Sequence, residues 1–238
     1  MIADVTAFLR KLAIPRFQLK FKDRYCAGKL LGDILNSELK GHRDGRIGDL
    51  IVLGIPRGGI VTACAVASKI SCELGITISR RIVAPHNQEL SIGAVAQDGT
   101  SYINQELMAA LSIPNEYVEK EKARLHEDVR EMVSRYGPGI PAKNFAQHVL
   151  VLIDDGSATG STLIAAVRYL RKHNPRQIVV GVPVATRGTA KLLSNEADTV
   201  QCIVKSEDNR FSSVEQFYDN FQEVSDLQVQ CLLWQCNP

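Results

Sequence analysis

The chain has 238 residues, of which 45% are hydrophobic and 23% charged, as is typical of a globular protein with room for one large α/β domain. Its 28 basic and 26 acidic residues give a net charge of +2, which supplies no overall signal for nucleic acid or membrane binding. The N-terminal sequence lacks the pattern of a secretory signal, and no apolar stretch approaches the ~20 residues of a membrane span. We therefore expect a soluble, cytoplasmic protein that binds neither nucleic acid nor membrane.

Three apolar runs alternate with helical segments along the chain. Residues 50–55 form the first run, which ends at Pro56-Arg57-Gly58-Gly59 and is followed by a helix to about residue 69. Residues 149–153 and 178–184 form the second and third runs, with a helix from about 161 to 172 between them. Runs that are apolar on both faces suit parallel strands covered by helices on both sides. The alternation predicts a doubly wound, mainly parallel α/β fold.

No repeat, low-complexity tract or long linker divides the chain, which predicts a single domain over residues 1–238. Residues 114–136 predict an inserted charged helix, and we expect its apolar stripe to pack on the core rather than on a partner. Residues 1–48 and 205–238 are expected to form a small hood, with the segments 17–25 and 211–234 over the edge of the sheet. The stripe of the inserted helix consists of Val118, Leu125, Val129, Met132 and Tyr136.

Six cysteines stand at positions 26, 64, 72, 202, 231 and 236, without a C-x-x-C pair or an accompanying histidine cluster. Cys64 lies in an apolar run, where a free cysteine behaves as a small hydrophobic residue. We therefore expect reduced, structural cysteines.

The segment that follows the second apolar run carries the strongest functional signal. The run delivers Asp154 and Asp155 to the carboxyl end of a buried strand, where ligands bind in open α/β sheets. The next residues open a helix, and Gly156 and Gly160 allow the backbone to approach a ligand closely. Hydroxyl groups and the N–H groups of the helix start complete a phosphate cradle. Its members are Gly156, Ser157, Ala158, Thr159, Gly160, Ser161 and Thr162.

The cradle differs from the two common nucleotide-binding loops. A nucleoside-triphosphate loop requires G-x-x-x-x-G-K-[ST], but position 155 is Asp and position 161 is Ser. The dinucleotide pattern G-x-G-x-x-G is also missing. A monophosphate cup preceded by two acids suits a sugar monophosphate, with the vicinal hydroxyls hydrogen-bonded to the carboxylates.

Residues 154–162 resemble the 5-phosphoribosyl-1-pyrophosphate signature of the type I phosphoribosyltransferases, and the resemblance extends from about residue 21 to residue 233. Within that family the chain is similar to a bacterial and archaeal subgroup of predicted phosphoribosyltransferases. The further matching segments are Phe21-Lys22-Asp23-Arg24, residues 53–59, residues 84–95 and Phe217-Tyr218-Asp219-Asn220-Phe221.

The resemblance implies a reaction in which a nitrogen nucleophile displaces pyrophosphate from C1 of the ribose, in the presence of Mg²⁺. Asp154 and Asp155 would hold the ribose hydroxyls and help to place the metal, which commonly keeps several waters and takes ligands from substrate phosphates. Pro56, Arg57, Gly58 and Gly59 stand where the family has its pyrophosphate loop, and Arg57 can pair with phosphate oxygens. A plain strand-to-helix turn with a solvated arginine is the alternative for this loop.

Residues 80–94 resemble the family's mobile loop, which closes over the reacting centre and excludes water. Arg80, Arg81, His86 and Glu89 are its candidates for binding pyrophosphate or assisting the nucleophile. The chain has Arg80-Arg81 where Arg-Lys is expected, so the role of that lysine passes to Arg81 or is lost. His86 replaces a small residue and could equally be a solvated loop residue.

The acceptor pocket is the least specified part of the sequence. Phe211 could stack on a planar base, and Lys205 or Asp208 could bind its polar edge. Packing of these aromatic residues within the hood is the alternative.

Three functions follow from the resemblance. The leading hypothesis is a Mg²⁺-dependent phosphoribosyltransferase of nucleotide metabolism, with Asp154, Asp155, Arg57 and Arg81 as the catalytic set. Its substrates would be phosphoribosyl pyrophosphate and an unidentified nitrogen nucleophile such as a nucleobase. A non-catalytic sensor of the same fold and a hydrolase that uses water are the alternatives, because the fold alone does not fix the function. The resemblance also makes a homodimer the expected assembly.

Overall fold

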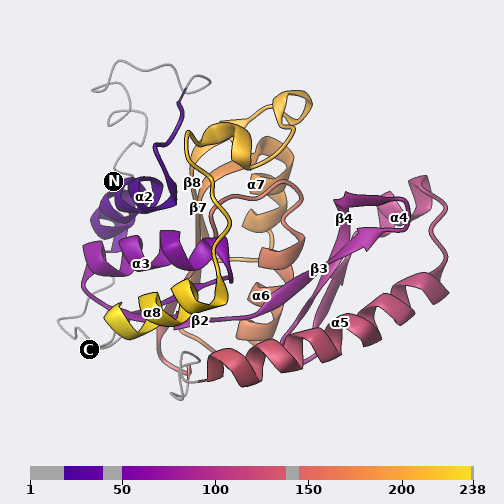
Figure 1. The fold of residues 1–238 in the computed structure, drawn as a ribbon, viewed down its shortest axis with the longest axis horizontal. Coiled ribbons are helices and arrows are strands. Elements are labelled where there is room, and N and C mark those ends of the chain that lie inside the picture. Colours follow the sequence, from indigo (N-terminus) through magenta and orange to yellow (C-terminus); the bar gives the residue numbers. More distant parts are fainter. Residues whose placement is uncertain (1–18, 40–49, 138–144, 237–238) are drawn as a thin grey trace.

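The computed structural model describes residues 19–39, 50–137 and 145–236 (Figure 1). In these ranges no helix has the length and apolar character needed to cross a membrane. The elements are α2 (Arg24–Leu39), β1 (Leu50–Gly54), α3 (Gly58–Ile70), β2 (Glu73–Ile76), β3 (Ser79–Ala84), β4 (Asn87–Ala96), β5 (Ser101–Ile103), α4 (Gln105–Ala110), α5 (Asn115–Tyr136), β6 (Val149–Ile153), α6 (Ser161–Arg171), β7 (Gln177–Thr186), α7 (Arg187–Ser194), β8 (Thr199–Ser206), the 3₁₀ turns η5 (Asp208–Arg210) and η6 (Glu215–Phe217), and α8 (Asp226–Cys236).

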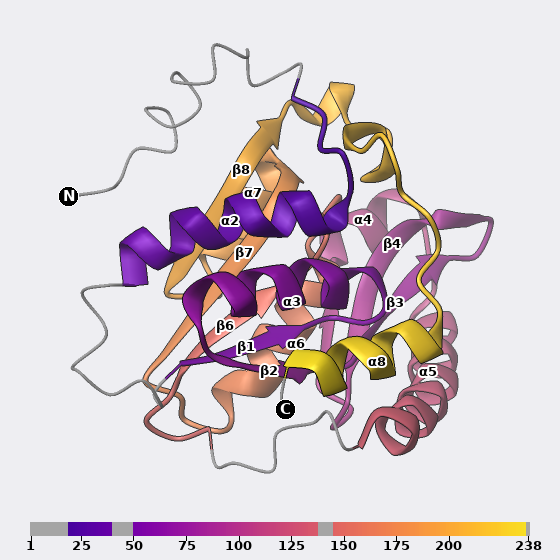
Figure 2. The same ribbon diagram turned by 60° about the vertical axis from the view of Figure 1, so that its left-hand side comes forward.

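Five parallel strands form the central sheet, in the order β2-β1-β6-β7-β8. From β1 the chain passes through α3 to the outer strand β2. From β6 it passes through α6 to β7 and through α7 to β8, which extends the sheet in the opposite direction. Helices α2 and α3 cover one face of the sheet and α6 covers the other (Figures 1 and 2). The predicted doubly wound, mainly parallel α/β fold is confirmed.

Alternate residues of the central strands face two separate cores. Val52 and Val151 pack in one cluster with side chains of α2 and α3, among them Leu31. Leu53 and Leu152 pack in the other with side chains of α6. All residues of β1 and β6 are buried, because helices cover both faces of these strands.

A smaller antiparallel sheet, β3-β4-β5, stands beside the central sheet and is covered by α5 (Figure 1). Val118 and Leu125 of α5 pack in a cluster with residues of β3 and β4, whereas Val129 and Tyr136 join the main core. Met132 is partly buried against the main core. The prediction that this stripe packs on the protein itself is confirmed. Residues 80–94, expected as a mobile loop, form most of the β3-β4 hairpin, and their mobility stays a prediction.

The two ends of the described chain meet on one side of the molecule. Phe21 forms a parallel β-bridge with Tyr218, and their rings lie 5.4 Å apart between centroids. Helix α8 packs on α3 and the edge strand β2. Residues 1–18, 40–49, 138–144 and 237–238, which include parts of the expected hood, lie outside the described residues. The division into a core and a hood remains a prediction.

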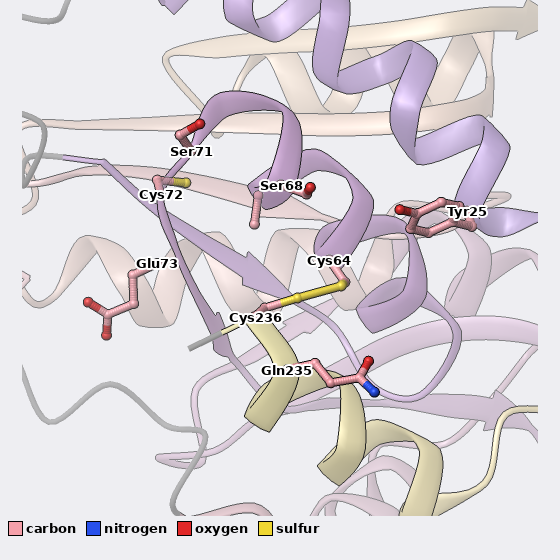
Figure 3. A pocket seen from close by; sticks show the side chains of 9 residues that line it. Tyr25, Cys64, Ser68, Ser71, Cys72, Glu73, Gln235 and Cys236 are labelled. Atoms are coloured by element: carbon pink, nitrogen blue, oxygen red, sulfur yellow. A yellow bond between two sulfur atoms is a disulfide. The ribbon is translucent and has the colours of Figure 1, made fainter. Parts of the chain in front are cut away.

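A disulfide joins Cys64 of α3 to Cys236 of α8 (Figure 3). The expectation of free cysteines is therefore wrong for this pair, because the packing of α8 on α3 brings together two residues 172 positions apart. Cys26, Cys72, Cys202 and Cys231 remain thiols. The disulfide borders a cavity of about 620 Å³, which contains none of the predicted site residues.

Candidate functional site

The predicted site lies where the two halves of the sheet diverge. Strands β1 and β6 are neighbours, paired in parallel up to Gly54 and Ile153, and the chain leaves them in opposite directions along the sheet. Such a switch point leaves a crevice outside the carboxyl ends of the strands, where ligands bind in open α/β sheets. The loop around Arg57 follows β1, and Asp154 and Asp155 follow β6. The fold therefore brings the two sequence motifs to one crevice.

A cavity of about 420 Å³ occupies this crevice. Four arginines, three carboxylates and much of the loop after β6 line it. It brings together most residues that the sequence predicts for the site and adds several that it does not, chiefly Arg24, Ser79, Ser91, Val214 and Phe221. The predicted residues at the cavity are Pro56, Arg57, Gly58, Arg80, Arg81, Glu89, Asp154, Asp155, Gly156, Ser157, Ala158, Thr159 and Thr162.

The loop between β6 and α6 is held in shape by its own hydrogen bonds. The Ser157 N–H donates to the Val184 carbonyl over 2.9 Å, and the Ser157 hydroxyl accepts from the Gly160 N–H over 3.1 Å. Gly160 has φ of +78°, in the left-handed region that favours glycine. It is also the N-cap residue of α6, so no side chain at that position caps the N–H groups of the first turn. Those groups and the helix dipole suit an anion such as a phosphate.

Asp154 and Asp155 form a tightly packed acidic pair. The Asp155 N–H donates to Asp154 Oδ1 over 2.9 Å, and Asp155 Oδ2 accepts from Arg24 Nε over 2.6 Å. Burial raises the pKa of Asp154 well above its ordinary value, and the charge of Asp155 raises it further. Burial also raises the pKa of Asp155, although the Arg24 guanidinium opposes that shift. The pair therefore favours holding a proton over carrying two negative charges, and a bound cation would favour the ionised form.

These pKa directions predict how Asp154 affects stability. Because the folded protein holds the Asp154 proton more tightly than the unfolded chain, the stability of the fold decreases as pH rises from the ordinary carboxyl value through the raised pKa. Replacing Asp154 with Asn should therefore raise the unfolding temperature of the ligand-free protein at neutral pH. The gain should disappear near the ordinary value of 3.8, where the carboxyl is neutral in both states. Thermal unfolding across this pH range measures the difference.

Asp198 provides a control of opposite sign. Burial would raise its pKa, but hydrogen bonds from Arg171 and from the Ile178 N–H outweigh burial and lower it. Ionised Asp198 therefore stabilises the fold above the ordinary carboxyl pKa, and this stabilisation is lost as pH falls. Asp198→Asn should lower the unfolding temperature at neutral pH. A gain for Asp154→Asn of equal size at every pH would contradict the electrostatic explanation.

Gly58 and Gly59 make room for the two carboxylates. A Cβ on Gly58 would lie 2.0 Å from Asp155 Oδ2 and 2.8 Å from Arg24 Nε, whereas a Cβ on Gly59 would lie 2.7 Å from Asp154 Oδ1. The sequence predicts these glycines for a close approach of the backbone to phosphate. The structure shows a second reason, since the first turn of α3 packs directly on the acidic pair.

Arg57 lies at the start of α3, after a cis peptide bond that joins it to Pro56. Its guanidinium pairs with Glu223 over 3.1 Å, and its Nε lies 4.0 Å from Asp226. The Arg57 and Glu223 side chains are 42% and 82% exposed, so this pair stabilises the fold little. A more highly charged phosphate could therefore replace Glu223 as the partner of Arg57 at low cost.

The remaining predicted residues lie outside this cavity. Gly59, Gly160 and Ser161 belong to its loops but are buried behind the surface. His86 is exposed at the β3-β4 turn. Lys205 lines a different cavity, of about 450 Å³, together with Arg187, Arg210 and Phe217. Phe211 packs on Phe217 at 5.3 Å between ring centroids and lines neither cavity, which favours its role in packing.

The acidic pair fits a metal that arrives with its substrate. Within the described ranges, no three His, Cys, Asp or Glu side chains gather in a way that could hold an ion. Mg²⁺ commonly uses one or two protein carboxylates, several waters and the oxygens of a bound phosphate. Asp154 and Asp155 can supply that small share directly or through water.

Comparison with known proteins identifies the family. The model of the phosphoribosyl transferase domain matches residues 27–220, so the chain belongs to this family. Relatives from two strains of Mycobacterium tuberculosis, provisionally named phosphoribosyl transferases, are 28% identical over 213 residues. A protein of Thermus thermophilus with a solved structure is 33% identical, with a TM-score of 0.70 over 91% of this chain and 99% of that one. The resemblance to phosphoribosyltransferases inferred from the sequence is thereby confirmed.

The matched region covers 90% of this chain but 46% of each mycobacterial relative. The chain thus spans about half the length of the curated relatives that it matches.

Proposed function

We propose that this chain is a Mg²⁺-dependent phosphoribosyltransferase, which transfers the phosphoribosyl group of 5-phosphoribosyl-1-pyrophosphate to a nitrogen nucleophile and releases pyrophosphate. One observation carries the proposal. The acidic pair Asp154-Asp155, the start of α6 and three exposed arginines line a single cavity at the switch point of the sheet. Each charged part of phosphoribosyl pyrophosphate thus has a partner of suitable chemistry within one cavity.

The parts of the substrate would occupy different walls of the cavity. The 5-phosphate suits the loop of residues 156–160 and the first turn of α6, where N–H groups and hydroxyls meet the helix dipole. The ribose hydroxyls suit the carboxylates of Asp154 and Asp155, which accept hydrogen bonds. The pyrophosphate suits Arg57, Arg80 and Arg81, which line the same cavity.

Catalysis would follow from position and charge. Displacement at C1 passes through a transition state with oxocarbenium character, while negative charge accumulates on the departing pyrophosphate. The guanidinium groups of the cavity would stabilise that charge, and bound Mg²⁺ would neutralise part of it. The negative acidic pair lies on the ribose side, where positive charge develops. Arg81 holds the position at which the family resemblance leads us to expect a lysine, and we propose that it contacts the pyrophosphate.

The acceptor is the least constrained part of the proposal. The 450 Å³ cavity beside Lys205 and Phe217 offers an aromatic wall and charged groups at the end of β8, which suits a planar nitrogenous base. We retain Lys205 as a candidate acceptor-binding residue, and nucleobases are the first acceptors to test. A homodimer and a role in nucleotide metabolism remain predictions from the resemblance.

Calorimetric titration of phosphoribosyl pyrophosphate, with and without Mg²⁺, tests binding. An assay of pyrophosphate release, with and without a panel of bases, then tests turnover. Release that requires a base supports the transferase, whereas release in water alone supports a hydrolase. Binding without release in any condition supports a sensor of the same fold. A folded protein that fails to bind phosphoribosyl pyrophosphate would refute the proposal.

A further inference from the structure

Arg24 is the most enclosed arginine of the cavity. It opens α2, and its side chain is 11% exposed, whereas that of Arg57 is 42% exposed and Arg80 and Arg81 are also exposed. Its Nε donates to Asp155 Oδ2 over 2.6 Å, across 131 positions of sequence. Because this nitrogen is already bonded to a carboxylate and the side chain is enclosed, Arg24 is poorly placed to move toward a phosphate.

The guanidinium of Arg24 is fixed in three directions. Besides the bond to Asp155, its Nη1 donates to the Gln222 carbonyl over 2.7 Å. Its Cζ lies 3.5 Å from the centre of the Phe221 ring, which is a close cation–π contact. A planar guanidinium can make these edge and face contacts together, and the ammonium of a lysine cannot.

The backbone of Asp155 is held by the same C-terminal segment. The Tyr218 hydroxyl donates to the Asp155 carbonyl over 2.5 Å. The rings of Tyr218 and Phe221 lie 5.0 Å apart between centroids. Gly58 packs so closely on Asp155 Oδ2 and Arg24 Nε that even a methyl group would not fit there. Asp155 is therefore held at its backbone by Tyr218 and at its carboxylate by Arg24.

We propose that Arg24 is a positioning residue, which fixes the carboxylate of Asp155 for the sugar hydroxyls and couples it to the C-terminal segment 218–222. The inference rests on the proposed function and adds a residue that acts through Asp155 rather than on the ligand. A carboxylate with one oxygen already held keeps its plane before the sugar arrives, so less conformational entropy is lost on binding. Inorganic pyrophosphate, which has no sugar, should depend on Arg24 only through the net charge of the cavity.

The test compares two ligands and a double-mutant cycle. Calorimetry measures phosphoribosyl pyrophosphate and inorganic pyrophosphate, both with Mg²⁺, on wild type, Arg24→Met, Arg24→Lys, Asp155→Asn and Arg24→Met/Asp155→Asn. Arg24→Met should weaken phosphoribosyl pyrophosphate by about ten-fold or more and inorganic pyrophosphate clearly less. The lost charge lowers the affinity for any anion, whereas the lost position of the carboxylate affects only the ligand with a sugar. Arg24→Lys should recover only part of the loss.

The double mutant decides whether Arg24 acts through Asp155. If it does, Arg24→Met/Asp155→Asn binds phosphoribosyl pyrophosphate no more weakly than Asp155→Asn alone. This double mutant removes both partners of the ion pair, so neither is left as an unpaired charge, and it keeps the test available if Arg24→Met does not fold. Arg130→Met is the control, since Arg130 is 66% exposed on α5 and pairs only with Glu127 among the ion pairs described.

Two results would overturn the inference alone. The first is a double mutant whose losses multiply, which would mean that Arg24 contacts the ligand directly. The second is an equal weakening of both ligands by Arg24→Met. A folded wild type that binds no phosphoribosyl pyrophosphate would instead overturn the proposed function, and this inference with it.

Discussion

Asp154→Asn/Asp155→Asn should lose nearly all of its affinity for phosphoribosyl pyrophosphate while it keeps its fold. The proposal assigns the ribose hydroxyls to these two carboxylates, which the structure places at the wall of one cavity. A charge-assisted hydrogen bond contributes about 1.5–3 kcal/mol, so two of them account for about 3–6 kcal/mol, or roughly a hundred- to ten-thousand-fold in affinity. Calorimetric titration with Mg²⁺ measures the loss.

The sign of the expected effect makes this result informative. Removing two acidic groups raises the positive potential of a cavity that contains four arginines, which alone would strengthen the binding of any polyanion. A large loss can therefore arise only from the specific contacts, including those to a metal. Inorganic pyrophosphate without Mg²⁺ should bind the mutant at least as well as the wild type.

A matched control removes the same charge elsewhere. Glu119 and Glu127 of α5 have side chains that are 68% and 67% exposed, and neither lines the cavity. Glu119→Gln/Glu127→Gln should bind phosphoribosyl pyrophosphate as the wild type does. If this control and the site mutant lose affinity equally, the loss does not come from contacts of Asp154 and Asp155, and the assignment of the ribose is wrong. Unchanged binding by the site mutant would also exclude the assignment.

The central sheet and the two motifs were predictable because their signals are local. Strands that are buried on both faces must be apolar at consecutive positions, so residues 50–54 and 149–153 are visible as short apolar runs. The sequence signal of the loop after Asp155 is equally local, since its closely spaced glycine and hydroxyl residues all belong to one turn. A parallel arrangement then brings both loops to the same edge of the sheet.

The rest of the site depends on contacts between distant segments. Arg24 reaches Asp155 across 131 positions, and no periodicity or spacing signals that pair. The resemblance of residues 21–24 to the family was its only indication, and it assigned no role. The β3-β4 hairpin was missed because a strand such as β3 buries its residues irregularly and shows no clean alternation. The ring of Phe211 packs on Phe217, so its expected stacking on a base stays a prediction.

The disulfide shows the same limit in another form. Cys64 stands in an apolar helix and Cys236 near the end of the chain, so each one alone suggests a small buried side chain. The pairing requires α8 to lie along α3, which no local pattern determines (Figure 3). The spacing of cysteines along the chain therefore cannot exclude a disulfide between helices that are far apart in the sequence but pack on each other.

Gly58→Ala should disrupt the site more than a single methyl group would normally do. The new Cβ would lie 2.0 Å from Asp155 Oδ2, and it would also press on Arg24 Nε at 2.8 Å. Neither group can move aside freely, because the two are bonded to each other and Arg24 is also held by Gln222 and Phe221. Overpacking of this kind costs about 1–3 kcal/mol of stability. Affinity for phosphoribosyl pyrophosphate should fall by about ten-fold or more if the carboxylate shifts from its hydrogen-bonding position.

Gly137→Ala is the matched control. Gly137 ends α5 with φ of −44° and ψ of −42°, and a Cβ there would meet no atom of the described residues within 4 Å. The same substitution should therefore be neutral, or should stabilise the protein by about 0.4–1 kcal/mol, because it restricts the unfolded chain without strain in the folded one. Chemical denaturation measures the stability of both variants, and ligand titration measures their affinity for phosphoribosyl pyrophosphate. A Gly58→Ala protein as stable and as tightly binding as Gly137→Ala would mean that the first turn of α3 yields to the added methyl group. The close packing of Gly58 on the acidic pair would then have no functional importance.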